Sequence, residues 1–135
     1  MAGYSTTPLV NKLGIKPNSK IKIVHEPDGY WDWVSPMPEG VSVAAKSPFH
    51  FIHLFFQSRQ KFESELLEFR EKLNPNGMIW VSWPKKSSNV KSDLDENMIR
   101  DFALKHKLVD VKVCAVTEVW SGLKLVIPVK DRPAK

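Results

Sequence analysis

The segment at residues 74–86, Asn-Pro-Asn-Gly-Met-Ile-Trp-Val-Ser-Trp-Pro-Lys-Lys, constrains the fold more than any other part of the chain. Its first four residues predict a tight turn, because proline fixes φ and Gly77 can supply a positive φ. The β-branched and aromatic residues at 78–83 scarcely alternate with polar ones, which is typical of a strand covered on both faces. Pro84 lacks a backbone donor and predicts the end of this strand.

Helical and strand-like segments alternate along the rest of the chain. The expected elements are a short helix at 8–13, a strand at 20–25, a helical turn at 30–34, a weak strand at 41–45, a strand at 49–56, a helix at 59–73, the strand at 78–83, a second helix beginning after Ser92 or Asp93, and a hairpin with strands at 109–119 and 123–129. This order predicts an α/β fold in three layers, with a doubly wound, mostly parallel sheet that ends in an antiparallel hairpin. We expect one domain over residues 1–135, with a loose tail at 130–135.

Several local signals predict how these elements begin, end and pair. Thr7 is expected to cap the first helix and Gly14 to end it, and Ser58 is expected to cap the helix at 59–73. The hairpin turn is expected at residues 120–122. Opposite charges four residues apart predict ion pairs on the exposed side of the long helix. These pairs are Arg59–Glu63, Lys61–Glu65 and Glu68–Lys72, and the buried stripe of the following helix is expected to be Leu94, Met98 and Phe102.

Composition limits the class of protein. A chain of 135 residues with 42% hydrophobic and 26% charged residues can bury a core without disulfides. The single cysteine, Cys114, fits a reducing compartment, and no apolar run approaches the roughly 20 residues that span a bilayer. The first residues do not resemble a signal peptide. The cytoplasm is therefore the expected location.

The positive charge leaves a role in nucleic-acid binding open. The net charge is +5, and three lysines fall within residues 85–91. Such a loop can attract phosphates, but a solvated lysine surface gives the same composition. No known nucleic-acid-binding module is recognisable in the sequence.

Two resemblances follow from these motifs. The order of elements from residue 49 onward, the Pro-Asn-Gly at 75–77 before a central strand, and the lead-in at 13–21 resemble a class I S-adenosylmethionine-dependent methyltransferase with a shortened Rossmann fold. The segments at 3–10, 51–55, 80–86 and 110–116 resemble a family of short bacterial proteins that carry a domain of unknown function. The first resemblance implies a Rossmann sheet, and the second supports the same fold.

The cofactor loop departs from the methyltransferase pattern. The resemblance implies an acidic residue and a Gly-x-Gly loop after the first strand, whereas residues 24–30 read Val-His-Glu-Pro-Asp-Gly-Tyr. Only Gly29 is present, Pro27 stiffens the loop, and Tyr30 would crowd the adenosyl pocket. The acidic residue expected after the second strand, for the ribose, is missing from residues 41–45. We therefore expect no cofactor, with S-adenosylmethionine as the one to test.

A ligand site is expected at the carboxyl edge of the sheet, where open α/β sheets bind their ligands. A tryptophan wall beside two lysines would suit a ring with an anionic group. The candidate binding residues are Trp83, Lys85, Lys86, Ser87, Ser58, Trp120 and Ser121. The weaker candidates for acid–base catalysis are His25, Glu26 and Asp28, and no cluster with metal-ligand spacing is present.

Three functional hypotheses follow. The first is a cytoplasmic, non-catalytic binding or regulatory protein on a degenerate methyltransferase-like fold, whose partner is a small anionic ligand or a protein. The second is a small S-adenosylmethionine-dependent methyltransferase with an altered cofactor loop. The third is a weak nucleic-acid binder acting through the loop at 85–91. Loss of the glycine loop favours the first hypothesis over the second.

Overall fold

The computed structural model describes residues 7–133. Its elements are α1 (Leu9–Leu13), β1 (Lys20–Val24), α2 (Tyr30–Trp33), β2 (Ser42–Val43), β3 (Phe49–Phe55), α3 (Arg59–Glu71), β4 (Leu73–Pro84), the 3-10 helix η1 (Lys86–Ser88), α4 (Glu96–Lys105), β5 (Val109–Ala115), β6 (Trp120–Val126) and the 3-10 helix η2 (Val129–Asp131). Of the segments named above, residues 3–6 and 134–135 lie outside this part. No helix within residues 7–133 has the length and apolar character needed to cross a membrane.

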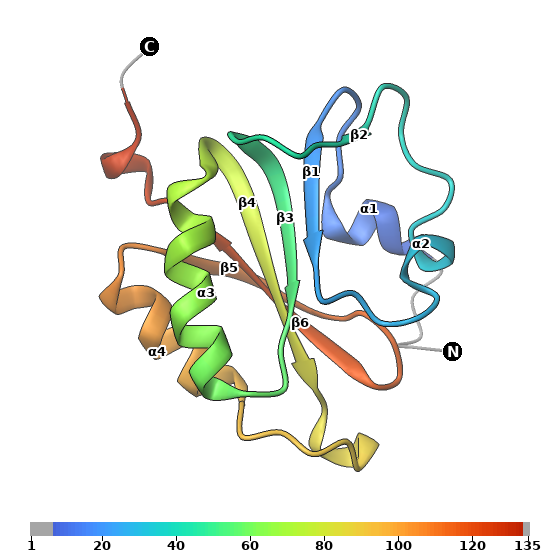
Figure 1. The fold of residues 1–135 in the computed structure, drawn as a ribbon, viewed down its shortest axis with the longest axis vertical. Helices are drawn as coiled ribbons and strands as arrows, with labels where there is room; N and C mark the ends of the chain where they lie inside the picture. Colours follow the sequence, from blue (N-terminus) through green and yellow to red (C-terminus); the bar gives the residue numbers. More distant parts are fainter. Residues whose placement is uncertain (1–6, 134–135) are drawn as a thin grey trace.

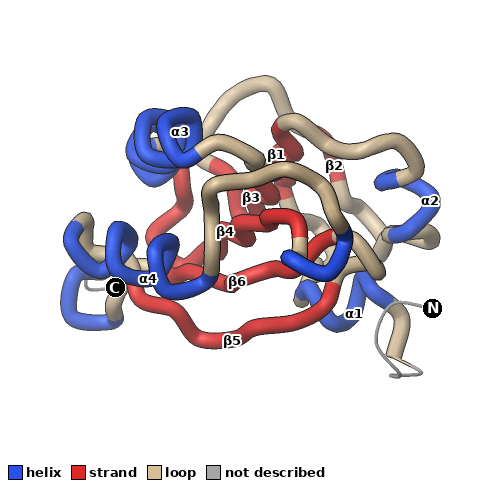
Figure 2. The backbone as a smooth tube through the Cα atoms, turned by 90° about the horizontal axis from the view of Figure 1, so that it is seen from below, coloured by secondary structure: helices blue, strands red, loops and turns tan. Residues whose placement is uncertain are grey.

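The strands form one mixed sheet between two layers of helices (Figures 1 and 2). Their order is β2-β1-β3-β4-β6-β5. The first four strands in this order are parallel, and β6 pairs antiparallel with both β4 and β5. The predicted three-layer, doubly wound sheet with a terminal antiparallel hairpin is therefore confirmed.

Each face of the sheet buries its own core. Helices α3 and α4 cover one face, where Ile52 and Leu54 of β3 pack with Phe62 of α3. Helices α1 and α2 cover the other face, where Phe51 and Trp80 pack with residues of α1 and α2. Because side chains alternate along a strand, consecutive residues of β3 and β4 supply the two cores in turn. This two-sided burial explains why the sequence at 78–83 lacks polar alternation.

The Asn-Pro-Asn-Gly segment lies inside β4 rather than in a turn before it, so the turn prediction is wrong. Phe49 pairs with Leu73 and Phe51 with Met78, so one residue of β3 opposes the four residues 74–77. This four-residue bulge is stabilised by a hydrogen bond from Asn76 N–H to Asn74 Oδ1 (2.9 Å). Gly77 has no positive φ. It is needed because a Cβ atom there would lie 2.6 Å from the backbone oxygen of His50.

The predicted helix ends are partly confirmed. Ser58 caps α3 by accepting a hydrogen bond from Lys61 N–H (3.3 Å), and Gly14 ends α1 in the left-handed conformation. However, α1 begins one residue later than predicted, with Pro8 in the N-cap position. Helix α4 also begins later, because the side chain of Asp95 accepts a hydrogen bond from Met98 N–H (2.8 Å) and fixes the start there.

Contacts between elements correct three further details. Leu94 of the predicted stripe is buried in the core but precedes α4. The buried residues of α4 itself are Ile99 and Ala103, while Met98 and Phe102 are partly buried at the edge of the core. The hairpin turn lies at residues 116–119, because residues 120–122 already belong to β6. In the expected tail, residues 129–131 form η2, and Arg132 Nε donates to Ile127 O (2.8 Å).

Candidate functional site

A hollow of about 400 Å³ lies at the carboxyl edge of the sheet. Parallel strands β1 and β3 end here side by side, α3 starts here, and antiparallel β6 brings its first residue to the same edge (Figure 1). Its lining residues are His25, Pro27, Phe55, Phe56, Gln57, Ser58, Lys61 and Trp120. This edge is where an open α/β sheet places its ligands.

His25 follows β1 directly and is fixed at the rim of the hollow. Its backbone is left-handed, with φ of 60°, a conformation that costs a non-glycine residue on the order of 1 kcal/mol. The imidazole Nε2 lies 2.8 Å from Glu65 Oε1 on α3, and the ring meets Phe56 edge-on at 5.9 Å. A histidine paired with a carboxylate can hold or move a proton at Nε2.

The opposite wall of the hollow is aromatic. Phe55 is buried and meets Trp120 edge to face at 5.1 Å between ring centroids. Gln57 and Lys61 are exposed beside this wall, so an amide and an ammonium group border an apolar surface. Such a combination suits a flat ring that carries an acceptor or an anionic group.

A buried polar network lies directly behind Phe55, whose ring stacks on His53 with 4.3 Å between centroids. Tyr30 Oη is 2.9 Å from His53 Nδ1, and His53 Nε2 is 2.8 Å from Ser82 Oγ. None of these three residues is exposed to solvent. A neutral imidazole donates from one nitrogen and accepts at the other, so it satisfies both hydroxyl groups at once.

Burial sets the protonation state of this network. It lowers the pKa of His53 to about 3, because the charged imidazolium would lose its hydration. Burial also raises the pKa of Tyr30, with a smaller contribution in the same direction from the charge of Glu26. Both groups are therefore neutral at pH 7. With no access to solvent, Ser82 and His53 serve to orient Tyr30 and β4 rather than to meet a substrate.

The structure places some of the predicted binding residues at the hollow and others elsewhere. Ser58 and Trp120 line it, as does the catalytic candidate His25. Trp83 pairs with Ser121 in the sheet and is buried in the core beneath α3 and α4. Trp120 packs with the other core, so the two indoles lie on opposite faces and do not converge.

The two predicted lysines lie beyond the end of β4. Lys85 donates its backbone N–H to Val119 O (2.7 Å), and Lys86 begins η1. Lys86 and Ser87 are exposed, and none of these three residues lines the hollow.

The sequence does not identify Lys61 and Glu65 as residues of this site. The sequence predicts an ion pair between Glu65 and Lys61 on the helix, but in the structure Glu65 pairs with His25. The other two predicted pairs form, with Nε of Arg59 2.9 Å from Glu63 and Nζ of Lys72 3.0 Å from Glu68. The position of Lys61 could have indicated it, because Lys61 lies in the first turn of the helix that Ser58 caps directly after a buried strand.

The residues present do not fit the S-adenosylmethionine that the methyltransferase resemblance implies. Gly29 is left-handed and exposed, and a Cβ atom there would lie 3.1 Å from Trp33 Nε1, so an indole packs against one side of this glycine. Tyr30 is buried in its network, and Glu26 and Asp28 are exposed outside the lining of the hollow. Strand β2 has two residues, and Ala44, Ala45 and Lys46 follow it without a carboxylate for a ribose.

Comparison with solved structures assigns the fold. The DhpI–SAH complex has a TM-score of 0.63 with this chain at 9% identity, covering 90% of this chain and 83% of that one. A SAM-dependent methyltransferase from Aquifex aeolicus has a TM-score of 0.57 at 12% identity, covering 89% and 88%. A TehB-like SAM-dependent methyltransferase from Corynebacterium glutamicum has a TM-score of 0.56 at 9% identity, covering 93% and 90%.

Sequence comparisons add no closer relative. No family model matches the chain, and no curated protein matches it. The similarity at 9–12% identity is therefore one of fold, and the chain has a methyltransferase-like Rossmann fold.

Proposed function

We propose that this chain is a binding protein without a methyl-transfer step, which takes a small ligand with a flat apolar ring and an anionic group. The hollow lined by Trp120, Gln57 and Lys61 carries this proposal, because it lies at the edge where Rossmann sheets bind ligands. The ring would lie against Trp120, and its anionic group would face Lys61.

Two features support binding in place of methyl transfer. The loop after β1 has a single glycine with Trp33 packed against it, so it lacks the glycine-rich backbone that approaches a cofactor closely. The volume of about 400 Å³ also falls within the range of small-molecule sites, which are mostly apolar with a few polar groups. His25 and Glu65 join the end of β1 to α3 and fix one side of the hollow.

Indole-3-carboxylate is a suitable probe, because it combines a flat ring with one carboxylate. We expect it to shift the indole N–H resonance of Trp120 and the side-chain amide of Gln57 in a ¹⁵N-correlated NMR titration. Trp120→Ala and Lys61→Met should each weaken binding at least fivefold. Lys105→Met, which removes an exposed lysine of α4, is the matched control and should bind as the wild type does. Equal binding by all four proteins would contradict the proposed site.

A further inference from the structure

Four lysines gather on the face of the sheet that α1 and α2 cover, and none of them lines the hollow described above. Lys12 belongs to α1 and Lys16 follows it, while Lys112 lies in β5 and Lys124 in β6. Figure 2 shows α1 beside the ends of β5 and β6, which brings these segments together despite their distance in sequence. We call these four residues the lysine cluster.

Hydrogen bonds fix the positions of two of these ammonium groups. Lys12 Nζ donates to the backbone oxygen of Ala115 (3.3 Å), and Lys112 Nζ donates to the backbone oxygen of Lys12 (3.2 Å). Lys124 Nζ lies beside Gly14, the residue that ends α1, 3.9 Å from where a Cβ atom on this glycine would be. The cluster is therefore a property of the packing between α1 and the hairpin, and not only of long side chains in solvent.

The arrangement places like charges against one another. Lys112 and Lys124 are direct cross-strand partners in the antiparallel pair of β5 and β6, a position where like charges are destabilising. Partial burial lowers the pKa of Lys124, and the nearby charges of Lys112 and Lys16 lower it further. Both effects oppose the charged form of Lys124.

No carboxylate compensates this charge within the part of the chain that the structure describes. None of the four lysines forms an ion pair with an aspartate or glutamate of residues 7–133, although five such pairs form elsewhere. A solvated surface would disperse its lysines or pair them with acids. A concentrated, uncompensated cluster that breaks a cross-strand pairing rule is typical of a site whose counter-charge comes from a ligand.

A second, smaller hollow includes one residue of the cluster, Lys16, in its lining. It has a volume of about 250 Å³ and lies at the amino end of β1, next to Lys16. Asn18, Ser19, His50 and Asn76 supply polar groups around it, although His50 Nδ1 already accepts a hydrogen bond from Lys20 N–H (2.9 Å). The cluster thus meets a compact polar hollow at Lys16, whereas an extended nucleic acid requires a stripe of positive charge.

We propose that the lysine cluster binds a compact phosphate compound carrying at least two negative charges, with pyrophosphate as the simplest representative. Ammonium groups bind phosphate oxygens as point charges, and several of them around one anion remove the mutual repulsion that the unliganded cluster contains. This inference is independent of the ligand proposed for the hollow at the carboxyl edge.

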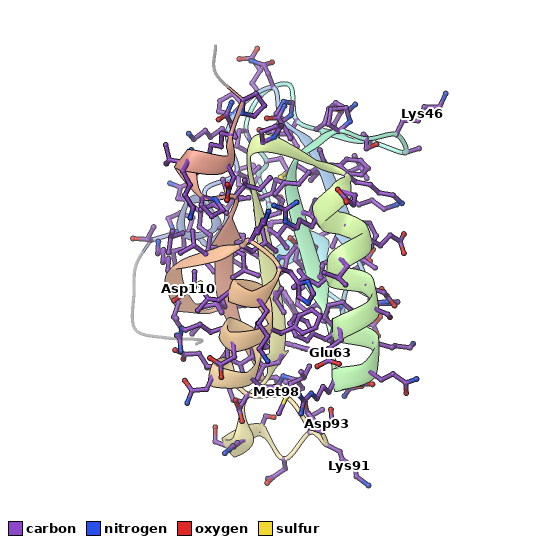
Figure 3. The ribbon with its side chains drawn as sticks, turned by 90° about the vertical axis from the view of Figure 1, so that its left-hand side faces the viewer. Lys46, Glu63, Lys91, Asp93, Met98 and Asp110 are labelled. Atoms are coloured by element: carbon purple, nitrogen blue, oxygen red, sulfur yellow. The ribbon has the colours of Figure 1, made fainter. Side chains whose placement is uncertain are left out.

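The test is calorimetric titration of pyrophosphate into the whole chain at constant ionic strength. The variant Lys112→Gln with Lys124→Gln removes the cross-strand pair. The control variant Lys46→Gln with Lys91→Gln removes the same two charges from exposed lysines that project from opposite ends of the molecule (Figure 3). We expect the wild type and the control to bind within a factor of two of each other, and the cluster variant to bind at least tenfold more weakly.

Two further measurements keep the outcome clear. Without ligand, the cluster variant should unfold cooperatively at a temperature close to that of the wild type, because the lost hydrogen bond of Lys112 to Lys12 O and the relieved repulsion act in opposite directions. Weaker binding by a variant that melts in this way does not come from unfolding. Equal pyrophosphate affinity in the wild type and the cluster variant would overturn the proposal. So would a wild type that binds a ten-residue oligothymidylate at low salt but not pyrophosphate, since this would assign the cluster to nucleic acid.

Discussion

His53 illustrates how burial decides the role of a single residue. In the sequence it is one of four histidines and lies three positions after His50. In the structure His50 accepts a hydrogen bond from the backbone of β1, while His53 joins Tyr30 to Ser82 without solvent contact. The network links α2, β3 and β4 behind the wall of the hollow. The network stabilises the fold because it pairs every hydroxyl and ring nitrogen of the three residues. An unpaired buried polar group would lower the free energy of unfolding by about 1–3 kcal/mol.

This network predicts a specific dependence of stability on pH. The pKa of His53 is about 3 in the folded protein and near 6.5 when unfolded, so between these values only the unfolded chain binds the proton. The free energy of unfolding should therefore fall as the pH falls below 6.5, by up to about 1.4 kcal/mol per pH unit. Urea unfolding at pH 7, 6 and 5 measures this slope before most carboxylates titrate.

The variant His53→Gln provides the comparison, because an amide can both donate and accept but does not titrate. We expect this variant to be less stable at pH 7 and to show little change in unfolding free energy between pH 6.5 and 5. His50→Gln should keep the slope of the wild type. The same slope in His53→Gln as in the wild type would rule out His53 as its source.

At the scale of elements, the periodic segments were predictable and the irregular ones were not. The apolar spacing of Phe62, Leu66 and Phe69 correctly predicted α3, since a helix of that length has one buried face. The segment at 74–77 carries strong turn signals, yet it forms a bulge in β4. Turn-forming residues indicate that the backbone can bend locally. Whether it bends in a turn or in a bulge is determined by the pairing with β3.

The bulge predicts the effect of replacing its glycine. In Gly77→Ala the new Cβ would lie 2.6 Å from His50 O and 2.9 Å from Leu73 Cδ1, so β3 and β4 must move apart. We expect a loss of about 1–3 kcal/mol in the free energy of unfolding, measured by urea denaturation at pH 7. The neighbouring change Asn76→Ala keeps the backbone N–H that donates to the side chain of Asn74. It should lower the free energy of unfolding by less than about 0.5 kcal/mol. Equal stability of the two variants would contradict this account of the bulge.

At the scale of the whole molecule, the order of elements predicted the sheet. Which residues form the site, however, depended on the face of the sheet to which each side chain points. Trp83 and Trp120 were both expected at the carboxyl edge, and both lie near it. However, Trp83 pairs with Ser121 and Trp120 with Pro84, so the indoles point to opposite sides of the sheet. Their register follows from the position of the hairpin turn, which local sequence signals placed too late by several residues. The pairing of His25 with Glu65, 40 residues apart, likewise required the complete fold.

The chain thus combines a methyltransferase-like sheet with a segment after β1 that lacks a glycine-rich loop. Trp33 packs against one side of the exposed glycine of this segment, the next residue Tyr30 is buried, and the first residue of the segment, His25, pairs with a carboxylate of α3. In this account the edge of the sheet remains a binding site, but for a smaller ligand than an adenosyl compound.

Calorimetric titration with S-adenosylhomocysteine, with indole-3-carboxylate titrated in parallel, tests this central claim most directly. The account predicts no saturable heat with S-adenosylhomocysteine and weak, saturable binding of the ring acid that Trp120→Ala reduces. Micromolar binding of S-adenosylhomocysteine would contradict it, because the loop after β1 would then accommodate an adenosyl group without a Gly-x-Gly sequence, and the chain would be a candidate methyltransferase.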